Sequence, residues 1–288
     1  MKKELVSLSV GWVLACLVTM AGAQEFKEHI SKEYTLSQEA GKTTLFVYNL
    51  EGFIKVEGYP GNKVLLEMDE TISADDDKTL ETGKKEFRLG FEQKVDSIVA
   101  YIAEPFDSRP HCNRHYHNDC CDIDYHYHVD FTVKVPFDLN LNLSTVNDGI
   151  ITVDNVNGVL HVNNVNAEIT INNAKGTTYA HTVNGDVTVN YLTNPFEQSS
   201  YYTINGNIRV SYQPDLSADL QFKSMHGDFY TDFPGAQLLP ASVTKKEEKK
   251  GGSIVYKLNT YTAVRFGKGG KTFKFETLNG NVYIKKQS

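Results

Sequence analysis

The sequence predicts an all-β fold, a flattened β-solenoid in which two short strands make each turn. A strand-like unit recurs every nine residues, apolar and polar residues alternate within each unit, and Asn-Gly or a close equivalent precedes most units. An antiparallel β-sandwich is the alternative, because Asn-Gly between alternating runs is also a hairpin signal. No comparable helical periodicity is present in the repeated region.

The nine-residue spacing is clearest between Thr145 and Val189. Nine residues are too few for a full coil of a three-sided β-helix, whereas two units make 18 residues, close to a later spacing of 21. Nearly identical units favour stacking, in which each unit buries its apolar face against the next. The key position of the unit is Gly149, Gly158, Ala167, Gly176, Gly185, Gly206, Gly227 and Gly280, with an outlying copy at Gly52.

Alternation within the units indicates strands with one buried face. After Gly185, for example, Asp186 and Thr188 alternate with Val187 and Val189. We therefore expect the two valines to face the core and Thr188 to face solvent. The same pattern places Ile208 and Val210 in the core and Arg209 in solvent.

Turns between the strands are marked by Asn-Gly pairs such as Asn184-Gly185, Asn205-Gly206 and Asn279-Gly280. Asparagine and glycine both tolerate positive φ. We therefore expect the glycines to let the chain turn sharply without steric cost.

The units resemble a known family. Thr182 to Val189 reads Thr-Val-Asn-Gly-Asp-Val-Thr-Val, with variants at Thr203 to Val210 and Thr277 to Ile284. Together with the opening run from Asn49 to Asn62, these units resemble the putative-adhesin domain family, a domain of unknown function in bacterial surface proteins. The resemblance covers about Thr43 to Lys285. It implies an extracytoplasmic β-rich or β-solenoid domain with no demonstrated ligand, and it supplies no catalytic residues.

Residues 1–23 read as a secretory signal peptide, with a basic start, an apolar stretch from Leu5 to Met20 and a small-residue cleavage site. Cleavage between Ala23 and Gln24 would leave 24–288 as a single adhesin-like β-repeat domain. The apolar stretch has 16 residues, whereas a membrane span needs roughly 20. We therefore expect an extracytoplasmic protein, periplasmic, on the outer surface or secreted, with no membrane span in the mature chain. Lipidation at Cys16, in a loose lipobox, is the alternative.

The net charge and the absence of catalytic motifs narrow the range of possible partners and activities. A net charge of −7 disfavours nucleic acid and anionic lipid as partners. The sequence has no Gly-x-Ser-x-Gly or His-Glu-x-x-His motif and no phosphate-cradling loop. We expect a non-enzymatic structural or interaction role in the envelope, with an unidentified envelope protein or glycan as partner. The enzyme alternative would place Glu168, Asp186 and Asp228 on the outer face of the coil, as in polysaccharide-cleaving solenoids.

The regions outside the repeat give weaker signals. Ser73 could cap a short helix ending at about Thr82, with a solvated acidic loop as the alternative. Lys245 to Gly252 is expected to be a charged loop with a solvated tip. Two strands are expected from the alternation of Phe87, Leu89 and Phe91 and of Ile98, Ala100 and Ile102.

A cluster of histidines and cysteines occupies an insert at 107–124 and the strand that follows it. Two His-x-His motifs each place two imidazoles on one face of a strand. In the second, Tyr125, Tyr127 and Val129 form one face and His126, His128 and Asp130 the other. Imidazole and thiolate are competent ligands for zinc or copper. The sequence therefore offers a metal-binding hypothesis, with zinc or copper held by His115, His117, His126 and His128.

The structural alternative for this cluster is a disulfide loop, with the histidines as exposed polar residues and no cofactor bound. Cys112 would bond either Cys120 or Cys121 in an oxidising compartment. Three cysteines leave one over, so the pairing stays open. Tight zinc signatures such as paired Cys-x-x-Cys motifs are not present.

Overall fold

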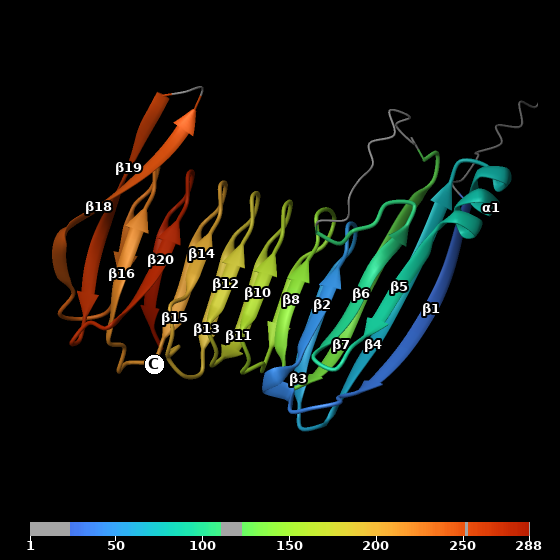
Figure 1. Ribbon diagram of the computed structural model, residues 1–288, viewed down its shortest axis with the longest axis horizontal. Coiled ribbons are helices and arrows are strands. Elements are labelled where there is room, and N and C mark those ends of the chain that lie inside the picture. The colour runs from blue at the N-terminus through green and yellow to red at the C-terminus, as the bar shows by residue number, and fades with distance from the viewer. Residues whose placement is uncertain (1–23, 111–122, 251–252, 288) are drawn as a thin grey trace, which may run out of the picture.

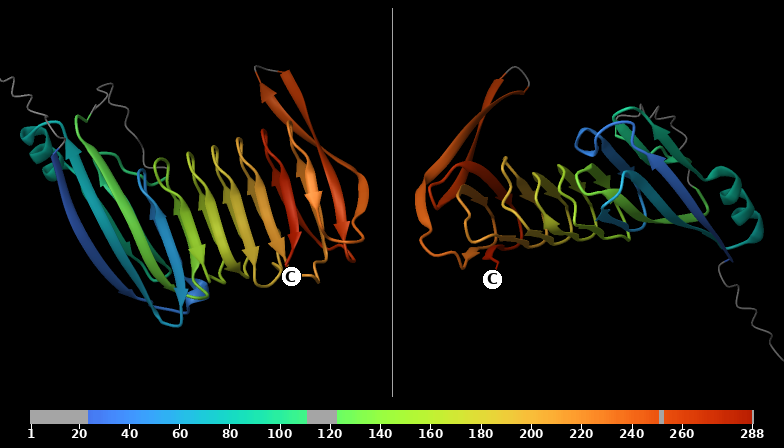
Figure 2. Two further views of the ribbon diagram at one scale, coloured as in Figure 1. Left: turned by 180° about the vertical axis from the view of Figure 1, so that it is seen from behind. Right: turned by 90° about the horizontal axis from the view of Figure 1, so that it is seen from below.

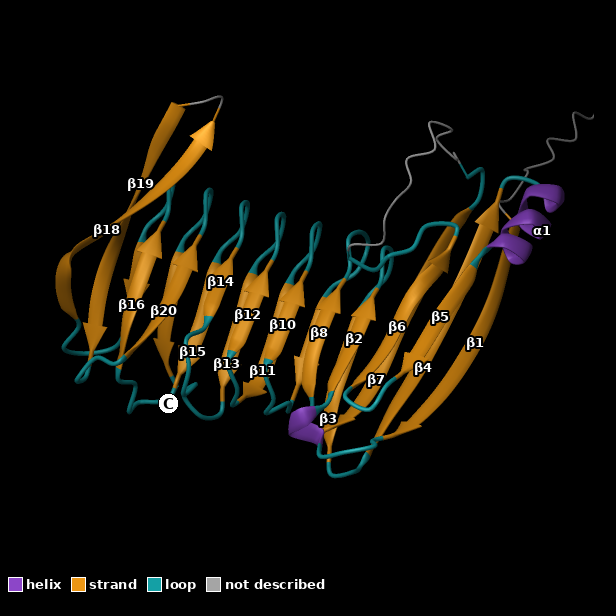
Figure 3. Cartoon of the chain, viewed as in Figure 1, coloured by secondary structure: helices purple, strands orange, loops and turns teal. Residues whose placement is uncertain are grey.

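Two facing β-sheets make up almost all of the protein (Figures 1 and 3). The computed structural model describes residues 24–110, 123–250 and 253–287. One sheet has ten strands and the other eleven, and they do not close into a barrel. Apolar side chains from both sheets form one continuous core between them.

The central part is a solenoid in which each coil contributes one strand to each sheet, and adjacent coils pair in parallel. In the 11-stranded sheet the stack runs β6 (Ser97–Glu104), β2 (Thr44–Tyr48), β8 (Asn140–Ser144), β10 (Leu160–Asn163), β12 (Thr178–His181), β14 (Ser200–Tyr202), β20 (Lys271–Glu276) and β16 (Ala218–Lys223). In the 10-stranded sheet the matching strands are β7 (His126–Pro136), β3 (Ile54–Tyr59), β9 (Ile151–Asp154), β11 (Ile169–Ala174), β13 (Val187–Tyr191), β15 (Ile208–Tyr212), β21 (Val282–Lys286) and β17 (Phe229–Thr231). The predicted flattened β-solenoid is therefore confirmed, and the antiparallel sandwich is wrong.

The order of the coils in the stack differs from their order in the chain. The coil β20–β21 lies between β14–β15 and β16–β17, although it follows both in sequence. At the other end, the coil β6–β7 lies outside β2–β3, which contacts β8–β9 directly. The outlying unit at Gly52 is thus a regular member of the stack.

Antiparallel strands and a helix cover the two ends. At one end β4 (Lys63–Ala74) pairs with β7, β1 (Gln24–Thr35) pairs with β4, and β5 (Arg88–Gln93) pairs with β6. A 3-10 turn (η1, Ala40–Lys42) precedes β2. At the other end β18 (Gln237–Lys250) and β19 (Ser253–Phe266) form a hairpin that projects past the coils (Figure 2). The charged loop predicted for Lys245 to Gly252 is wrong for residues 245–250, because these residues belong to β18.

Helix α1 (Asp77–Glu86) begins later than the sequence suggested. Its N-cap is Asp76, whose carboxylate accepts hydrogen bonds from the backbone N–H groups of Lys78 and Thr79. Ser73 instead lies in β4. The acidic run offers several competing cap residues, and the end of β4 decides which of them is used.

Alternation along the coil strands is confirmed. Val187, Val189, Ile208 and Val210 are each fully buried, and Thr188 and Arg209 lie on the outer face between them. At the C-terminal coils the core becomes aromatic. There the Tyr191 and Tyr201 hydroxyls lie 2.7 Å apart and the Tyr212 hydroxyl donates to that of Tyr201. Burial raises the pKa of these three tyrosines.

The glycines at the turns are needed for close approach of neighbouring coils, whereas the expected positive φ is found at only two of the repeated positions, Gly52 and Gly280. A Cβ at Gly206 would lie 2.0 Å from the carbonyl oxygen of Gly185, and one at Gly176 would lie 2.0 Å from that of Gly158. Neither position has positive φ. In these turns positive φ is instead adopted by Asp148, Asn155 and Asn173. The repeated glycine therefore sets the spacing of the coils.

Two sets of side-chain hydrogen bonds join neighbouring coils at the same turns. Buried threonines donate to the turn carbonyl of the preceding coil in the stack, as Thr203 does to Gly185 at 2.9 Å. Thr145, Thr182 and Thr277 repeat this bond. On the outside, each Asn side-chain amide donates to the Asn of the adjacent coil, at 2.7–2.9 Å, along Asn147, Asn166, Asn184, Asn205 and Asn279. Such ladders lock identical units in register.

Candidate recognition face

The carboxylates considered for catalysis occupy equivalent turn positions in the stack. Asp186 accepts the backbone N–H of Asn207 at 2.7 Å and forms an ion pair with Arg209. Burial raises its pKa, but these contacts outweigh burial and hold the pKa below the usual value. Asp228 lies three coils from Asp186, which is about 14 Å at ~4.8 Å per strand. Asp186 therefore serves the joint between two coils and has no carboxylate partner at Asp228, whereas Glu168 lies in the adjacent coil on its other side.

The coils between Asp186 and Asp228 repeat that structural role in the same row. The side-chain oxygens of Asn207 and Asn281 accept the backbone N–H groups of Asn281 and Asp228, respectively. At the other end of the solenoid Asp130 accepts the N–H of Phe53. In three successive coils the Asp or Asn that follows the turn glycine, Asp186, Asn207 or Asn281, thus bonds the next coil in the stack.

The predicted histidine and cysteine cluster is only partly within the described residues. His115, His117, Cys112, Cys120 and Cys121 lie outside them, as do Cys16, Ala23 and the rest of the signal segment. Gln24 is the first residue of β1. His126 and His128 occupy the outer side of β7, and His128 Nε2 lies 2.9 Å from Asp130. Within the described ranges, no group of three or more His, Cys, Asp or Glu side chains is placed to hold a metal ion. Zinc or copper binding therefore stays a prediction.

The outer face of the 11-stranded sheet carries a set of aromatic side chains that the sequence analysis did not single out. Because the coils are in register, these side chains fall into two adjacent rows across the strands. We call this surface the aromatic face. It comprises Phe46, Tyr48, Tyr101, His161, Tyr179, His181 and Tyr202.

Ring contacts join neighbouring coils of the aromatic face. The His161 and Tyr179 rings are stacked with centroids 4.5 Å apart, and His181 and Tyr202 meet edge to face at 6.0 Å. Burial lowers the pKa of both histidines, and for His181 the neighbouring His161 lowers it further. The imidazoles are therefore neutral at neutral pH, and the centre of the face carries no charge from them.

Short polar residues fill the positions between the rings. Asn142, Asn163, Ser144 and Ser200 occupy the same two rows. The Ser200 hydroxyl lies 3.1 Å from His181 Nε2. Hydroxyl, amide and imidazole groups thus alternate with ring faces, which gives a surface able to stack and to form hydrogen bonds at once.

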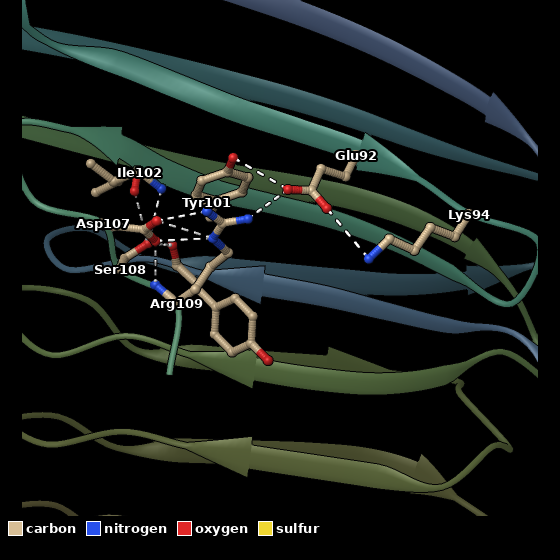
Figure 4. A network of polar contacts seen from close by, with 8 residues as sticks. Glu92, Lys94, Tyr101, Ile102, Asp107, Ser108 and Arg109 are labelled. Atoms are coloured by element: carbon tan, nitrogen blue, oxygen red, sulfur yellow. Dashed lines mark hydrogen bonds and ion pairs between the residues drawn. The ribbon is translucent and has the colours of Figure 1, made fainter. Parts of the chain in front are cut away.

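An ionic network anchors the loop after β6 at one end of the aromatic face (Figure 4). The Arg109 guanidinium lies over the Tyr101 ring at 3.9 Å and pairs with Glu92 and Asp107 at 2.5 and 2.7 Å. The Ser108 hydroxyl donates to the Tyr48 carbonyl at 2.7 Å. The residues that lead into the His/Cys insert are therefore fixed directly beside the aromatic face.

The opposite outer face differs in chemistry. Along β9, β11 and β13 its outward positions are Thr152, Thr170 and Thr188 in one row and Asp154, Asn172 and Asn190 in the next. The amides of Asn172 and Asn190 donate to the preceding coil at 2.8 and 2.9 Å. No outward position of these three strands holds an aromatic residue; elsewhere on this face the described outward positions include Tyr59 at the end of β3, His126 and His128 on β7, and the stacked pair Tyr230 and Tyr283 near the C-terminal end.

No protein-family model and no curated protein matches the chain. Among solved structures, a putative cell adhesion protein from Clostridium sporogenes is 13% identical over 91% of this chain and 100% of its own, with a TM-score of 0.43. A putative adhesin from Bacteroides fragilis is 11% identical over 90% and 97%, with a TM-score of 0.36. A putative lipid binding protein from Parabacteroides distasonis is 10% identical over 90% and 97%, with a TM-score of 0.30. These are similarities of overall fold.

The described part of the chain contains no helix long and apolar enough to span a membrane.

Proposed function

We propose that the protein is an exported, non-enzymatic envelope or surface protein that binds a glycan through the aromatic face. The observation that carries the proposal is the run of neighbouring rings on β10, β12 and β14, interleaved with hydroxyls and amides, on the outer face of the 11-stranded sheet. Ring faces stack against the C–H-rich faces of sugar rings, and the flanking polar groups can bond their hydroxyls. Rows that continue from coil to coil suit an extended polymer.

The charge of the aromatic face favours a neutral glycan over a charged partner. His161 and His181 are held neutral by burial, and Asn and Ser occupy the positions beside them. An adhesin-like role is consistent with this chemistry, and the inter-coil bonds of Asp186 support the absence of catalysis.

The experiment is a binding assay of the mature chain, 24–288, on an array of neutral oligosaccharides that includes β-linked glucose, N-acetylglucosamine, xylose and mannose polymers. Tyr179→Ala and Tyr202→Ala should each abolish binding to the glycan that the wild type retains. Tyr230→Ala is the matched control, because Tyr230 is an exposed tyrosine on the opposite sheet, 48% accessible.

Equal loss of binding in Tyr230→Ala, or no glycan retained by the wild type, would contradict the proposal. Capture of an envelope protein that depends on Tyr179 and Tyr202 but not on Tyr230 would also reject the glycan and assign the face to a protein partner.

A further inference from the structure

Strand β1 forms the open edge of the 10-stranded sheet. It pairs with β4 over all twelve of its residues and has no strand on its other side among the described residues. Figure 1 shows it as the outermost strand at one end of the solenoid. A long edge strand presents a row of unpaired N–H and C=O groups, which is a template for pairing with another strand.

The side chains of β1 are self-complementary in one antiparallel register. When two copies run antiparallel with Ile30 opposite Ile30, Glu28 of each copy faces Lys32 of the other. In the same register Lys27 faces Glu33 and Phe26 faces Tyr34. Two-fold symmetry makes each of these pairs occur twice. Opposite charges and paired rings at directly opposed positions stabilise an antiparallel pair.

Neighbouring registers lack this complementarity. A shift by one residue brings Lys27 opposite Lys32 in one direction and Glu28 opposite Glu33 in the other, and it also mismatches the two faces of the sheet. A shift by two residues sets Glu25 against Glu33 or Lys32 against Ile30. Charged residues on an edge normally prevent pairing. Here a single register converts the same charges into matched pairs.

Within one copy Lys27 pairs with Glu25, Glu33 pairs with Lys63 and the Lys32 ammonium lies over the Phe91 ring, so pairing would exchange these exposed contacts for contacts between copies. Glu28 lies opposite Glu70 of β4, so its closest cross-strand neighbour is another carboxylate. Lys32 of a second copy would place a cation beside the carboxylates of Glu28 and Glu70. On the same side of β1, Phe26, Ile30 and Tyr34 are only partly buried and pack against the end of the core. Continuing the sheet would cover them.

We propose that the protein forms a two-fold symmetric dimer in which β1 of one copy pairs antiparallel with β1 of a second copy, with Ile30 on the axis. The two 10-stranded sheets then join into one continuous sheet. The two solenoids extend in opposite directions from the joint, and each dimer carries two aromatic faces.

Charge reversal tests the register. The mature chain, without an N-terminal tag, is measured by sedimentation equilibrium at low ionic strength. Glu28→Lys and Lys32→Glu should each weaken dimerisation by about tenfold or more, because each creates two like-charge pairs. The double variant Glu28→Lys with Lys32→Glu should restore the dimer. Mixing the two single variants should give a heterodimer, since both charge pairs are then matched again.

Disulfide trapping tests the axis. In a chain with Cys112, Cys120 and Cys121 replaced by serine, Ile30→Cys should form a covalent dimer on mild oxidation, because directly opposed residues meet disulfide geometry. Ser31→Cys is the control, since the register places Ser31 opposite His29. Circular dichroism confirms that each variant is folded. A monomeric wild type, a dimer indifferent to both charge reversals, or equal trapping at both cysteines would overturn the proposal.

Discussion

Glu70→Gln should stabilise the protein near neutral pH and remove a pH dependence that Glu70 confers. Glu70 lies in the inward-facing row of β4 and is 8% exposed. Burial, and to a smaller extent the opposing Glu28 carboxylate, raise the pKa of its carboxyl to about 7 against the opposing effect of Arg88. The difference from the ordinary value of 4.5 corresponds to about 3 kcal/mol, at ~1.4 kcal/mol per pH unit.

The sign follows from proton binding. The folded state holds the Glu70 proton more tightly than the unfolded state, so Glu70 stabilises the fold below its unfolded pKa of 4.5, and this contribution is lost as pH rises through about 7. Glutamine does not titrate. The unfolding free energy of Glu70→Gln minus that of the wild type should therefore increase by about 3 kcal/mol between about pH 4 and about pH 8.

Urea unfolding followed by circular dichroism at both pH values measures this difference. Trp12, the only tryptophan of the chain, lies in the predicted signal segment, so tryptophan fluorescence is not a probe of the mature protein. Hydrogen exchange of the β1 amides gives a local reading of the same effect. Asp75→Asn, which removes an exposed carboxylate nearby, should leave the pH dependence unchanged. A Glu70→Gln difference that is the same at both pH values would refute the reasoning.

Three further outcomes are expected. Gly206→Ala should destabilise by about 3 kcal/mol or more in urea unfolding, because its Cβ would meet the carbonyl of the adjacent coil; wild-type stability would show that the coils can separate freely. Val189→Asp should be severely destabilising and Thr188→Asp nearly neutral, since only the first buries a charge; equal melting temperatures would contradict the strand register. Zinc or copper titration should show binding that weakens below about pH 6.5 and is lost in His126→Ala with His128→Ala; unchanged binding in that variant would reject the metal site.

The coil and its inward-facing residues could be predicted because they depend on local pattern. Val187 and Val189 alternate with polar residues, and the half-coil length follows from the spacing of Gly176 and Gly185. The reason for the glycines could not be predicted. Whether Gly206 turns the chain or admits a neighbouring carbonyl depends on a coil that is 21 residues away.

The aromatic face was missed because its residues are spread over separate half-coils. Each strand taken alone shows His161 or Tyr179 only as one outward-facing residue. The parallel pairing of β10 with β12 brings the two rings within stacking distance. A usable signal was present, since the outward positions of β10, β12 and β14 hold aromatic residues where the alternate half-coils hold threonine and asparagine. The stacking order of the end coils was not predictable, because similar units can stack in many orders.

The order of the C-terminal coils bears on how the chain assembles during synthesis. The coil β16–β17 leaves the ribosome before β20–β21, yet β20–β21 is the coil that joins it to the rest of the stack. Growth by simple addition of each new coil can therefore proceed only as far as β14–β15. The coil β16–β17 has no coil to pair with until residues 271–286 have been synthesised and insert between it and β14–β15. The stacking order therefore makes the completion of this end depend on a late insertion, after residues 271–286 have been synthesised.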